Sequence, residues 1–176
     1  MVEDFNWQRQ ERAINRFSHF IAPVNGIDLH FIHEKGSGPK PLPLLISHGW
    51  PGSIVEFLDI IEPLTHPERF GGSENDAFDV IIPSLPGFGF SSRPTRPIGP
   101  RKIADLFGAL MTEILGYNGY LAQGGDWGGA ISSWLGFEHA PACRAIHINI
   151  LTMRHPDGPV GLEEENWAVE FDREQL

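Results

Sequence analysis

The chain has 176 residues, of which 41% are hydrophobic, and a formal net charge of −10. This length and composition suit one globular domain with its own core. The acidic balance argues against a nucleic-acid partner, because such binding depends on clustered Lys and Arg. The single Cys143 excludes an internal disulfide or a cysteine metal cluster. There is no signal-like start and no apolar run of about 18 residues, so we expect a soluble, cytoplasmic protein with no membrane segment, metal or cofactor.

The first part of the chain predicts a hairpin, a strand and a helix. Two short β-type runs within residues 17–33 flank Asn25-Gly26, a dipeptide that supplies the positive φ angles of a tight turn. The apolar run at residues 42–47 is typical of a parallel strand covered on both faces. Ser53 and Glu56 have the spacing of a capping box. Apolar residues then recur at helical spacing, at Ile54, Val55, Leu58, Ile61 and Leu64.

Strands and helices continue to alternate down to residue 150. The expected elements are strands at 78–82, 119–123 and 143–150, and helices at 103–115, ending at Gly116, and 127–139. This alternation predicts an α/β fold, with a mostly parallel sheet flanked by helices and right-handed crossovers. From His155 the sequence turns to Pro, Gly and acids, so no further strand is expected before Leu176.

Gly124-Gly125-Asp126-Trp127-Gly128 places a carboxylate in a glycine-flanked turn between a predicted strand and a predicted helix. Hydrolases hold their nucleophile at such a strained turn, where flanking side chains would collide with the neighbouring strand and helix. An Asp, with a reference pKa of about 3.9, is already ionised near neutral pH and needs no base. Its attack on saturated carbon would leave an alkyl ester on the enzyme. The expected substrate is therefore an electrophilic carbon with a leaving group, such as an epoxide or an alkyl halide.

Two further glycine-rich motifs follow predicted strands. His48-Gly49-Trp50-Pro51 stands where an oxyanion-hole loop would face the turn, and the loop at residues 86–91 follows the next strand. Alone, Gly-x-Asp-x-Gly is more often an ordinary turn. Three such motifs in this order, all at the carboxyl edge of a parallel sheet, favour a ligand site there.

These motifs together resemble those of epoxide hydrolases of the α/β-hydrolase fold, specifically the microsomal-type branch. Residues 5–11 and Asn15-Arg16-Phe17 resemble the junction between that branch's amino-terminal meander and its hydrolase core, and residues 27–34 resemble its second core strand. The resemblance implies three parts. Residues 1–16 are the tail of the meander, 17–154 the first part of the core, truncated after about the sixth strand, and 155–176 the start of a cap linker.

The resemblance also implies roles for individual residues. Asp126 is the nucleophile, and the backbone amides of Trp50 and Trp127 form the oxyanion hole. The remaining implied residues support the loop and the turn: His48, Gly49, Pro51, Gly124, Gly125 and Gly128. The Trp50-Pro51 peptide is expected to be cis. Epoxide opening would give an ester on the enzyme and, after hydrolysis, a vicinal diol.

In the family, two cap tyrosines, a charge-relay acid and a histidine that activates water all follow the sixth strand, so this chain is expected not to complete turnover. Tyr117 and Tyr120 precede Asp126 and are expected in the core or at a helix end. The histidines downstream of Asp126 are His139, His147 and His155. None of them matches the position of the family's histidine. His30 and His33 are expected to make surface or loop contacts.

Two alternatives remain open at this point. A haloalkane dehalogenase uses the same Asp-Trp turn, but it usually has Asn where this chain has Trp50, which favours epoxides. The chain is alternatively a non-catalytic fragment that serves as a binding or assembly module. In either case an exposed sheet edge predicts self-association.

Overall fold

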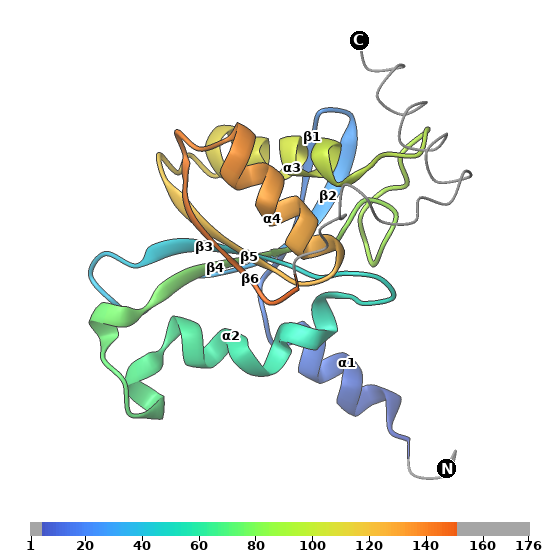
Figure 1. Cartoon of the computed structure of the whole chain (residues 1–176). Helices are drawn as coiled ribbons and strands as arrows, with labels where there is room; N and C mark the ends of the chain where they lie inside the picture. Colours follow the sequence, from blue (N-terminus) through green and yellow to red (C-terminus); the bar gives the residue numbers. More distant parts are fainter. Residues whose placement is uncertain (1–4, 151–176) are drawn as a thin grey trace.

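The computed structural model describes residues 5–150, which form one sheet between two layers of helices (Figure 1). The six strands are β1 (His19–Val24), β2 (Ile27–Glu34), β3 (Leu42–Ser47), β4 (Phe78–Pro83), β5 (Tyr120–Gly124) and β6 (Cys143–Ile148). The α-helices are α1 (Trp7–Asn15), α2 (Leu58–Thr65), α3 (Pro100–Ala109) and α4 (Trp127–Glu138). Short helical turns complete the described chain: η1 (Ile54–Phe57), η2 (Pro67–Phe70), η3 (Glu74–Asp76) and the π-helical η4 (Leu110–Ile114).

The sheet has the strand order β1-β2-β4-β3-β5-β6. β1, β2 and β4 pair in antiparallel fashion, while β4, β3, β5 and β6 run parallel to one another. The predicted α/β fold with a mostly parallel sheet is therefore confirmed. The predicted opening hairpin is also present, with positive φ angles at Asn25 (47°) and Gly26 (84°).

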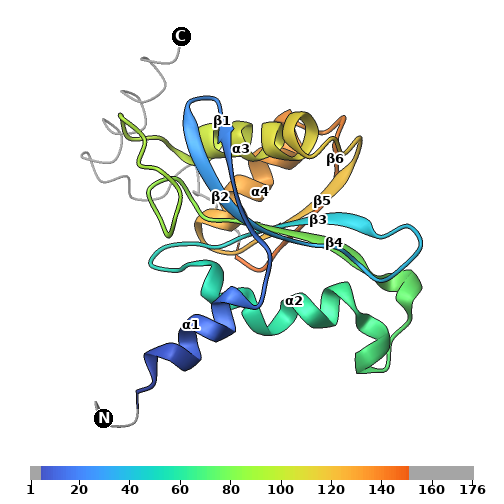
Figure 2. The same ribbon diagram turned by 180° about the vertical axis from the view of Figure 1, so that it is seen from behind.

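The parallel strands bury both faces, as their continuous apolar sequences predict. Leu45 and Ile81 pack on the face covered by α3 and α4, whereas Ile46 and Val80 pack on the face covered by α2. Figure 2, seen from behind, shows the same two layers on either side of the sheet. Side chains alternate between the faces of a strand, so one short apolar run serves two cores.

Two predicted helices differ in detail from the expectation. Ser53 and Glu56 form the predicted capping box, but the turn that they cap is the 3-10 turn η1, and α2 follows it. The helix before Gly116 ends in the π-helical turn η4, after which Gly116 takes a φ of 73°. The expectations for residues 155–176 lie outside the described residues.

Candidate active site

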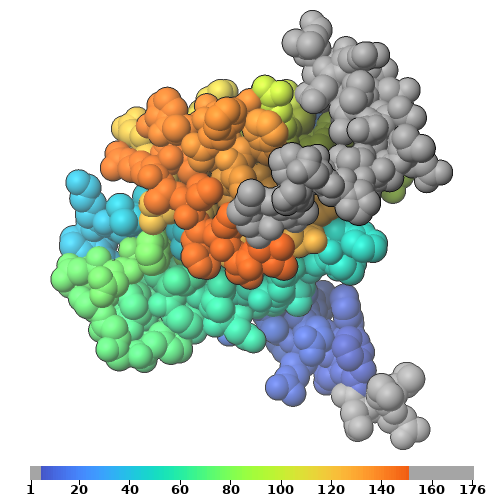
Figure 3. Space-filling view, viewed as in Figure 1, coloured from blue at the N-terminus to red at the C-terminus, as the bar shows by residue number. Residues whose placement is uncertain are grey.

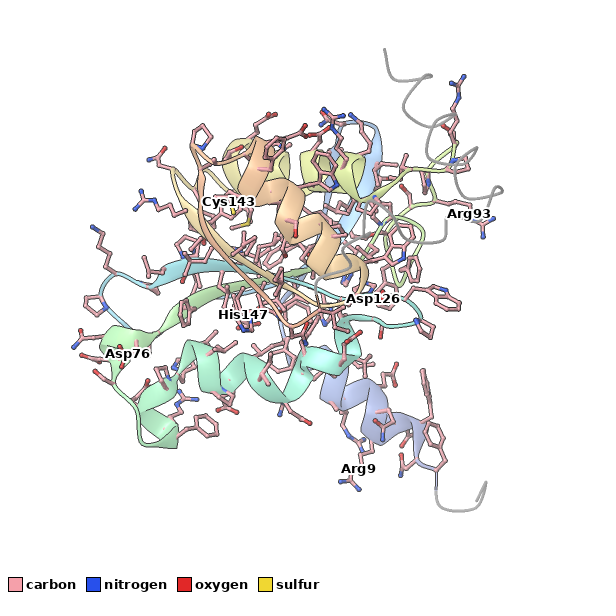
Figure 4. The ribbon with its side chains drawn as sticks, viewed as in Figure 1. Arg9, Asp76, Arg93, Asp126, Cys143 and His147 are labelled. Atoms are coloured by element: carbon pink, nitrogen blue, oxygen red, sulfur yellow. The ribbon has the colours of Figure 1, made fainter. Side chains whose placement is uncertain are left out.

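Asp126 occupies the sharp turn between β5 and α4. Its φ of 52° and ψ of −126° lie outside the regions that non-glycine residues favour, so the backbone is strained here. The side chain is exposed at the carboxyl edge of the parallel strands, beside the amino end of α4 (Figure 4). Strain of this kind persists only where the surrounding structure enforces it.

The glycines around Asp126 allow a very close approach between backbone segments. A Cβ on Gly128 would overlap the Ser47 carbonyl group in β3, and a Cβ on Gly124 would overlap the backbone of Gly128. A Cβ on Gly49 would overlap the carboxylate of Asp126 itself. The turn therefore fits between β3 and its own helix only because these three residues have no side chain.

The loop after β3 reaches the Asp126 carboxylate directly. The Trp50 amide donates a hydrogen bond to Asp126 Oδ1 at 2.8 Å. The Trp50-Pro51 peptide is cis, and the Gly52 amide donates to the Gly49 carbonyl at 2.8 Å, which closes the turn. Within the described residues no hydrogen bond joins the Trp127 amide to the Asp126 side chain, so the role of Trp127 as a second oxyanion donor stays a prediction.

His48 fixes the shape of this loop from inside the protein. The Leu85 amide donates to His48 Nε2 at 3.0 Å, so Nε2 carries no proton. The proton is on Nδ1, which donates to the Gly49 carbonyl at 3.0 Å. Burial lowers the pKa of His48 and keeps the ring neutral near pH 7. The geometry agrees with a bracing role rather than a role in proton transfer.

Both candidate tyrosines lie away from Asp126. The Tyr117 hydroxyl donates to Asp79 Oδ2 at 2.8 Å and is 2.8 Å from Lys35 Nζ, near the start of β4 and therefore at the opposite edge of the sheet. Tyr120 is 1% exposed, in the core beneath α3 and α4. These positions match the expected helix-end and core roles.

The described downstream histidines lie away from Asp126, as expected, whereas the burial of His30 was not expected. His139 Nε2 lies 3.1 Å from Asp105 Oδ1 at the far end of α4, and His147 is exposed on β6, apart from Asp126 (Figure 4). His155 lies outside the described residues. For His30 the expected loop contacts are present, with Ser84, Phe90 and Ser91, but the alternative of a surface position is wrong. Its ring is 2% exposed, because His19 on β1 and Phe90 after β4 cover it.

Sequence analysis also missed the partners of this buried ring. His30 Nδ1 lies 2.9 Å from the Ser84 hydroxyl, and the His30 amide donates to Ser91 Oγ at 3.0 Å. Ser84 and Ser91 follow His30 in the sequence by 54 and 61 residues, respectively. Only the serines at the two ends of the segment after β4 indicate such partners.

The arrangement suits nucleophilic attack. One carboxylate oxygen of Asp126 is held by the Trp50 amide, and the other accepts no hydrogen bond from the described residues. Trp50 and Phe90, each 66% exposed, supply apolar surface at the same edge. Among residues 5–150 no three His, Cys, Asp or Glu side chains gather as a metal ion would require, and no helix has the length and apolar character of a membrane span.

The parallel sheet, the strained Asp126 turn and the loop that donates to it define the class as an α/β hydrolase with a carboxylate at the turn between β5 and α4. The chain belongs to the α/β-hydrolase family. Residues 43–169 match the family model described as alpha/beta hydrolase fold, and residues 1–57 match the model described as Epoxide hydrolase N terminus.

Named relatives are epoxide hydrolases. The chain is 38% identical over 152 residues to Epoxide hydrolase 1 of Oryctolagus cuniculus, covering 84% of this chain and 33% of that protein. It is 41% identical over 160 residues to Juvenile hormone epoxide hydrolase 1 of Ctenocephalides felis, covering 89% and 34%. The crystal structure of juvenile hormone epoxide hydrolase from Bombyx mori has a TM-score of 0.78 at 34% identity, covering 88% of this chain and 37% of that one. The chain spans about a third of the length of the curated relatives that it matches.

Proposed function

We propose that this chain carries the nucleophile and oxyanion part of an epoxide hydrolase site. The observation that carries the proposal is the Asp126 carboxylate on its strained turn, with one oxygen held by the Trp50 amide at 2.8 Å and the other free to attack. The names of the relatives support epoxides as the substrate class. Trp50, where a dehalogenase usually has Asn, also favours an epoxide over an alkyl halide.

The first step forms a bond between the free Asp126 oxygen and an epoxide carbon and breaks that carbon's bond to the ring oxygen. The ring oxygen leaves as an alkoxide, which must take up a proton, and the enzyme is left as an alkyl ester. In this ester the oxygen held by the Trp50 amide becomes the carbonyl oxygen. Water then attacks the carbonyl carbon, and the charge that develops on that oxygen is stabilised by the Trp50 amide and, as we propose, by the Trp127 amide. Collapse of this intermediate breaks the bond between the carbonyl carbon and the ester oxygen, so the diol leaves as an alkoxide that takes up a proton and the Asp126 carboxylate is regenerated.

The second step needs a base to activate water, and such assistance is typically worth about 100- to 10,000-fold. Within residues 5–150 neither His139 nor His147 contacts Asp126. We therefore expect the isolated chain to accumulate the ester instead of turning over. Slow ester formation is also expected, because Tyr117 and Tyr120 are not placed to donate a proton to the alkoxide.

The test is covalent labelling of the 176-residue chain by styrene oxide. Intact-protein mass spectrometry should show one added substrate mass, and peptide mapping should locate it at Asp126. Asp126→Asn is the matched control, since the amide oxygen can still accept from Trp50 but the side chain is a far poorer nucleophile. A folded parent chain without label at Asp126 would refute the proposal, as would release of diol in many turnovers by Asp126→Asn. Bromide release from an alkyl bromide, with no labelling by the epoxide, would favour a dehalogenase instead.

We also propose that the isolated chain self-associates through β6. Within the described residues β6 pairs only with β5, which leaves one row of backbone donors and acceptors unpaired. Ile146 on this strand is 39% exposed, and Figure 3 shows the orange-to-red β6 segment at the surface. The cytoplasmic compartment and the domain boundaries near residues 16 and 154 stay predictions.

A further inference from the structure

Buried polar side chains gather behind the catalytic edge, around the loop that follows β4. This exit loop comprises residues 84–92, and it lies at the same edge of the sheet as Asp126 (Figures 1 and 4). His30, His48, Ser84 and Ser91 are each at most 8% exposed and account for half of the eight buried polar residues in the described chain. Polar groups are costly to bury unless hydrogen-bonded, so this concentration indicates that the position of the loop is closely specified.

The exit loop is tied to β2 at two residues, Asp28, which exchanges two hydrogen bonds of 2.9 Å with Ser92, and His30. The Ser84 amide donates to the His30 carbonyl at 2.9 Å, and the His30 amide donates to Ser91 Oγ at 3.0 Å. Ser91 Oγ in turn donates to the Ser84 carbonyl at 2.8 Å. One backbone position of β2 thus holds both ends of the loop.

The His30 ring adds a directed chain of side-chain hydrogen bonds. The Ile14 carbonyl can only accept, so His19 Nε2, 3.0 Å away, carries a proton. In the neutral ring His19 Nδ1 must then accept from His30 Nε2, at 2.9 Å. His30 Nδ1 is left to accept from the Ser84 hydroxyl, also at 2.9 Å. Burial, and next the neighbouring His19, lower the pKa of His30 to about 4, which keeps the ring neutral at pH 7.

This chain of contacts ends at the proposed nucleophile. Leu85, the residue after Ser84, donates its amide to His48, which holds the Gly49 carbonyl. The next amide, that of Trp50, donates to Asp126. A displacement of Ser84 therefore moves the donor that fixes His48 and, through it, the loop that orients the carboxylate.

We infer that His30 is a positioning residue for the Asp126 site. Its ring accepts a hydrogen bond from the Ser84 hydroxyl, and this bond keeps the Leu85 amide in place to donate to His48. His19 extends the same chain to the end of α1, which connects the amino-terminal segment to the catalytic edge. The expected effect of His30 on the reaction rate rests on the proposed function, whereas its expected effect on the Leu85–His48 hydrogen bond does not.

The experiment compares four proteins in the full 176-residue chain. His30→Phe keeps a planar ring between His19 and Phe90 but removes the acceptor, whereas His30→Asn places an amide oxygen where Nδ1 accepted. Ser84→Ala removes the donor from the other side. NMR measures hydrogen exchange at the Leu85 amide and the ring nitrogen shifts of His48, which report its tautomer. Neither readout requires activity.

We expect Leu85 exchange to become at least about tenfold faster in His30→Phe and Ser84→Ala, since the local opening free energy falls. His48 should lose its single tautomer in both variants, and His30→Asn should stay close to the parent. In His30→Phe and Ser84→Ala the maximal rate of Asp126 labelling by styrene oxide should fall about tenfold, while the half-saturating concentration of styrene oxide stays unchanged.

The inference is overturned if Leu85 and His48 are unchanged in folded His30→Phe and Ser84→Ala, or if His30→Asn is as perturbed as His30→Phe. If His30→Phe does not fold, Ser84→Ala alone decides in the same way. Failure of the proposed function is a distinct result, in which the parent itself remains unlabelled whatever the NMR signals show.

Discussion

Gly128→Ala is the sharpest test of the turn that carries Asp126, because two physical effects oppose each other there. Gly128 lies in the first turn of α4, where helix propensity favours Ala over Gly by up to about 1 kcal/mol. The added Cβ, however, would overlap the Ser47 carbonyl oxygen and carbon. Ser47 ends β3, which is hydrogen-bonded to β4 and β5 on its two sides, so its backbone has little freedom to move.

The steric effect should exceed the propensity effect. Overpacking typically costs about 1–3 kcal/mol and occasionally more, and overlap with fixed backbone belongs at the upper end. We expect a net loss of about 2 kcal/mol in the free energy of unfolding. For a chain of this size that corresponds to a melting temperature lower by about 4–8 °C.

Gly136→Ala is the matched control in the same helix. The three atoms nearest to its Cβ would all belong to the side chain of Ile146, the nearest at 3.0 Å, and this partly exposed side chain can move. The control should therefore be neutral or slightly stabilising. Thermal and urea unfolding, followed by circular dichroism, measure both variants. A Gly128→Ala protein as stable as the parent, or an equal loss in Gly136→Ala, would refute the close approach of the turn to β3.

Two further predictions concern pH and assembly. The folded-state pKa of His30, about 4, lies below the ordinary value of 6.5, so the unfolded chain binds a proton that the folded chain excludes. The contribution of neutral His30 to the free energy of unfolding should therefore be complete above about pH 6.5, and it should fall by up to about 3 kcal/mol as the pH is lowered toward 4. Urea unfolding across this range should show a shallower pH dependence for His30→Phe, and identical slopes would contradict the assignment. Sedimentation velocity should detect dimers of the parent chain, and Ile146→Lys should weaken this association. A parent chain that stays monomeric at all concentrations would exclude pairing through β6.

The local features of this protein were readable from contiguous residues. Asn25-Gly26 predicted the hairpin, and Ser53 with Glu56 predicted the capped turn that precedes α2. The Gly-Gly-Asp-Trp-Gly segment predicted the position of Asp126 between a strand and a helix. Each depends on backbone preferences that act over a few residues, so the sequence alone determines them.

Only the tertiary structure decided which distant groups meet. β4 lies between β2 and β3, an order that no local pattern specifies, and this order places Ser84 against His30 and Leu85 against His48. The buried state of His30 could not be read from its own strand, since the groups that cover it come from β1 and from the exit loop. Strand order and register are set by how two cores close over the whole sheet, and the orientation of the Asp126 carboxylate by an amide 76 residues away is a result of that closure.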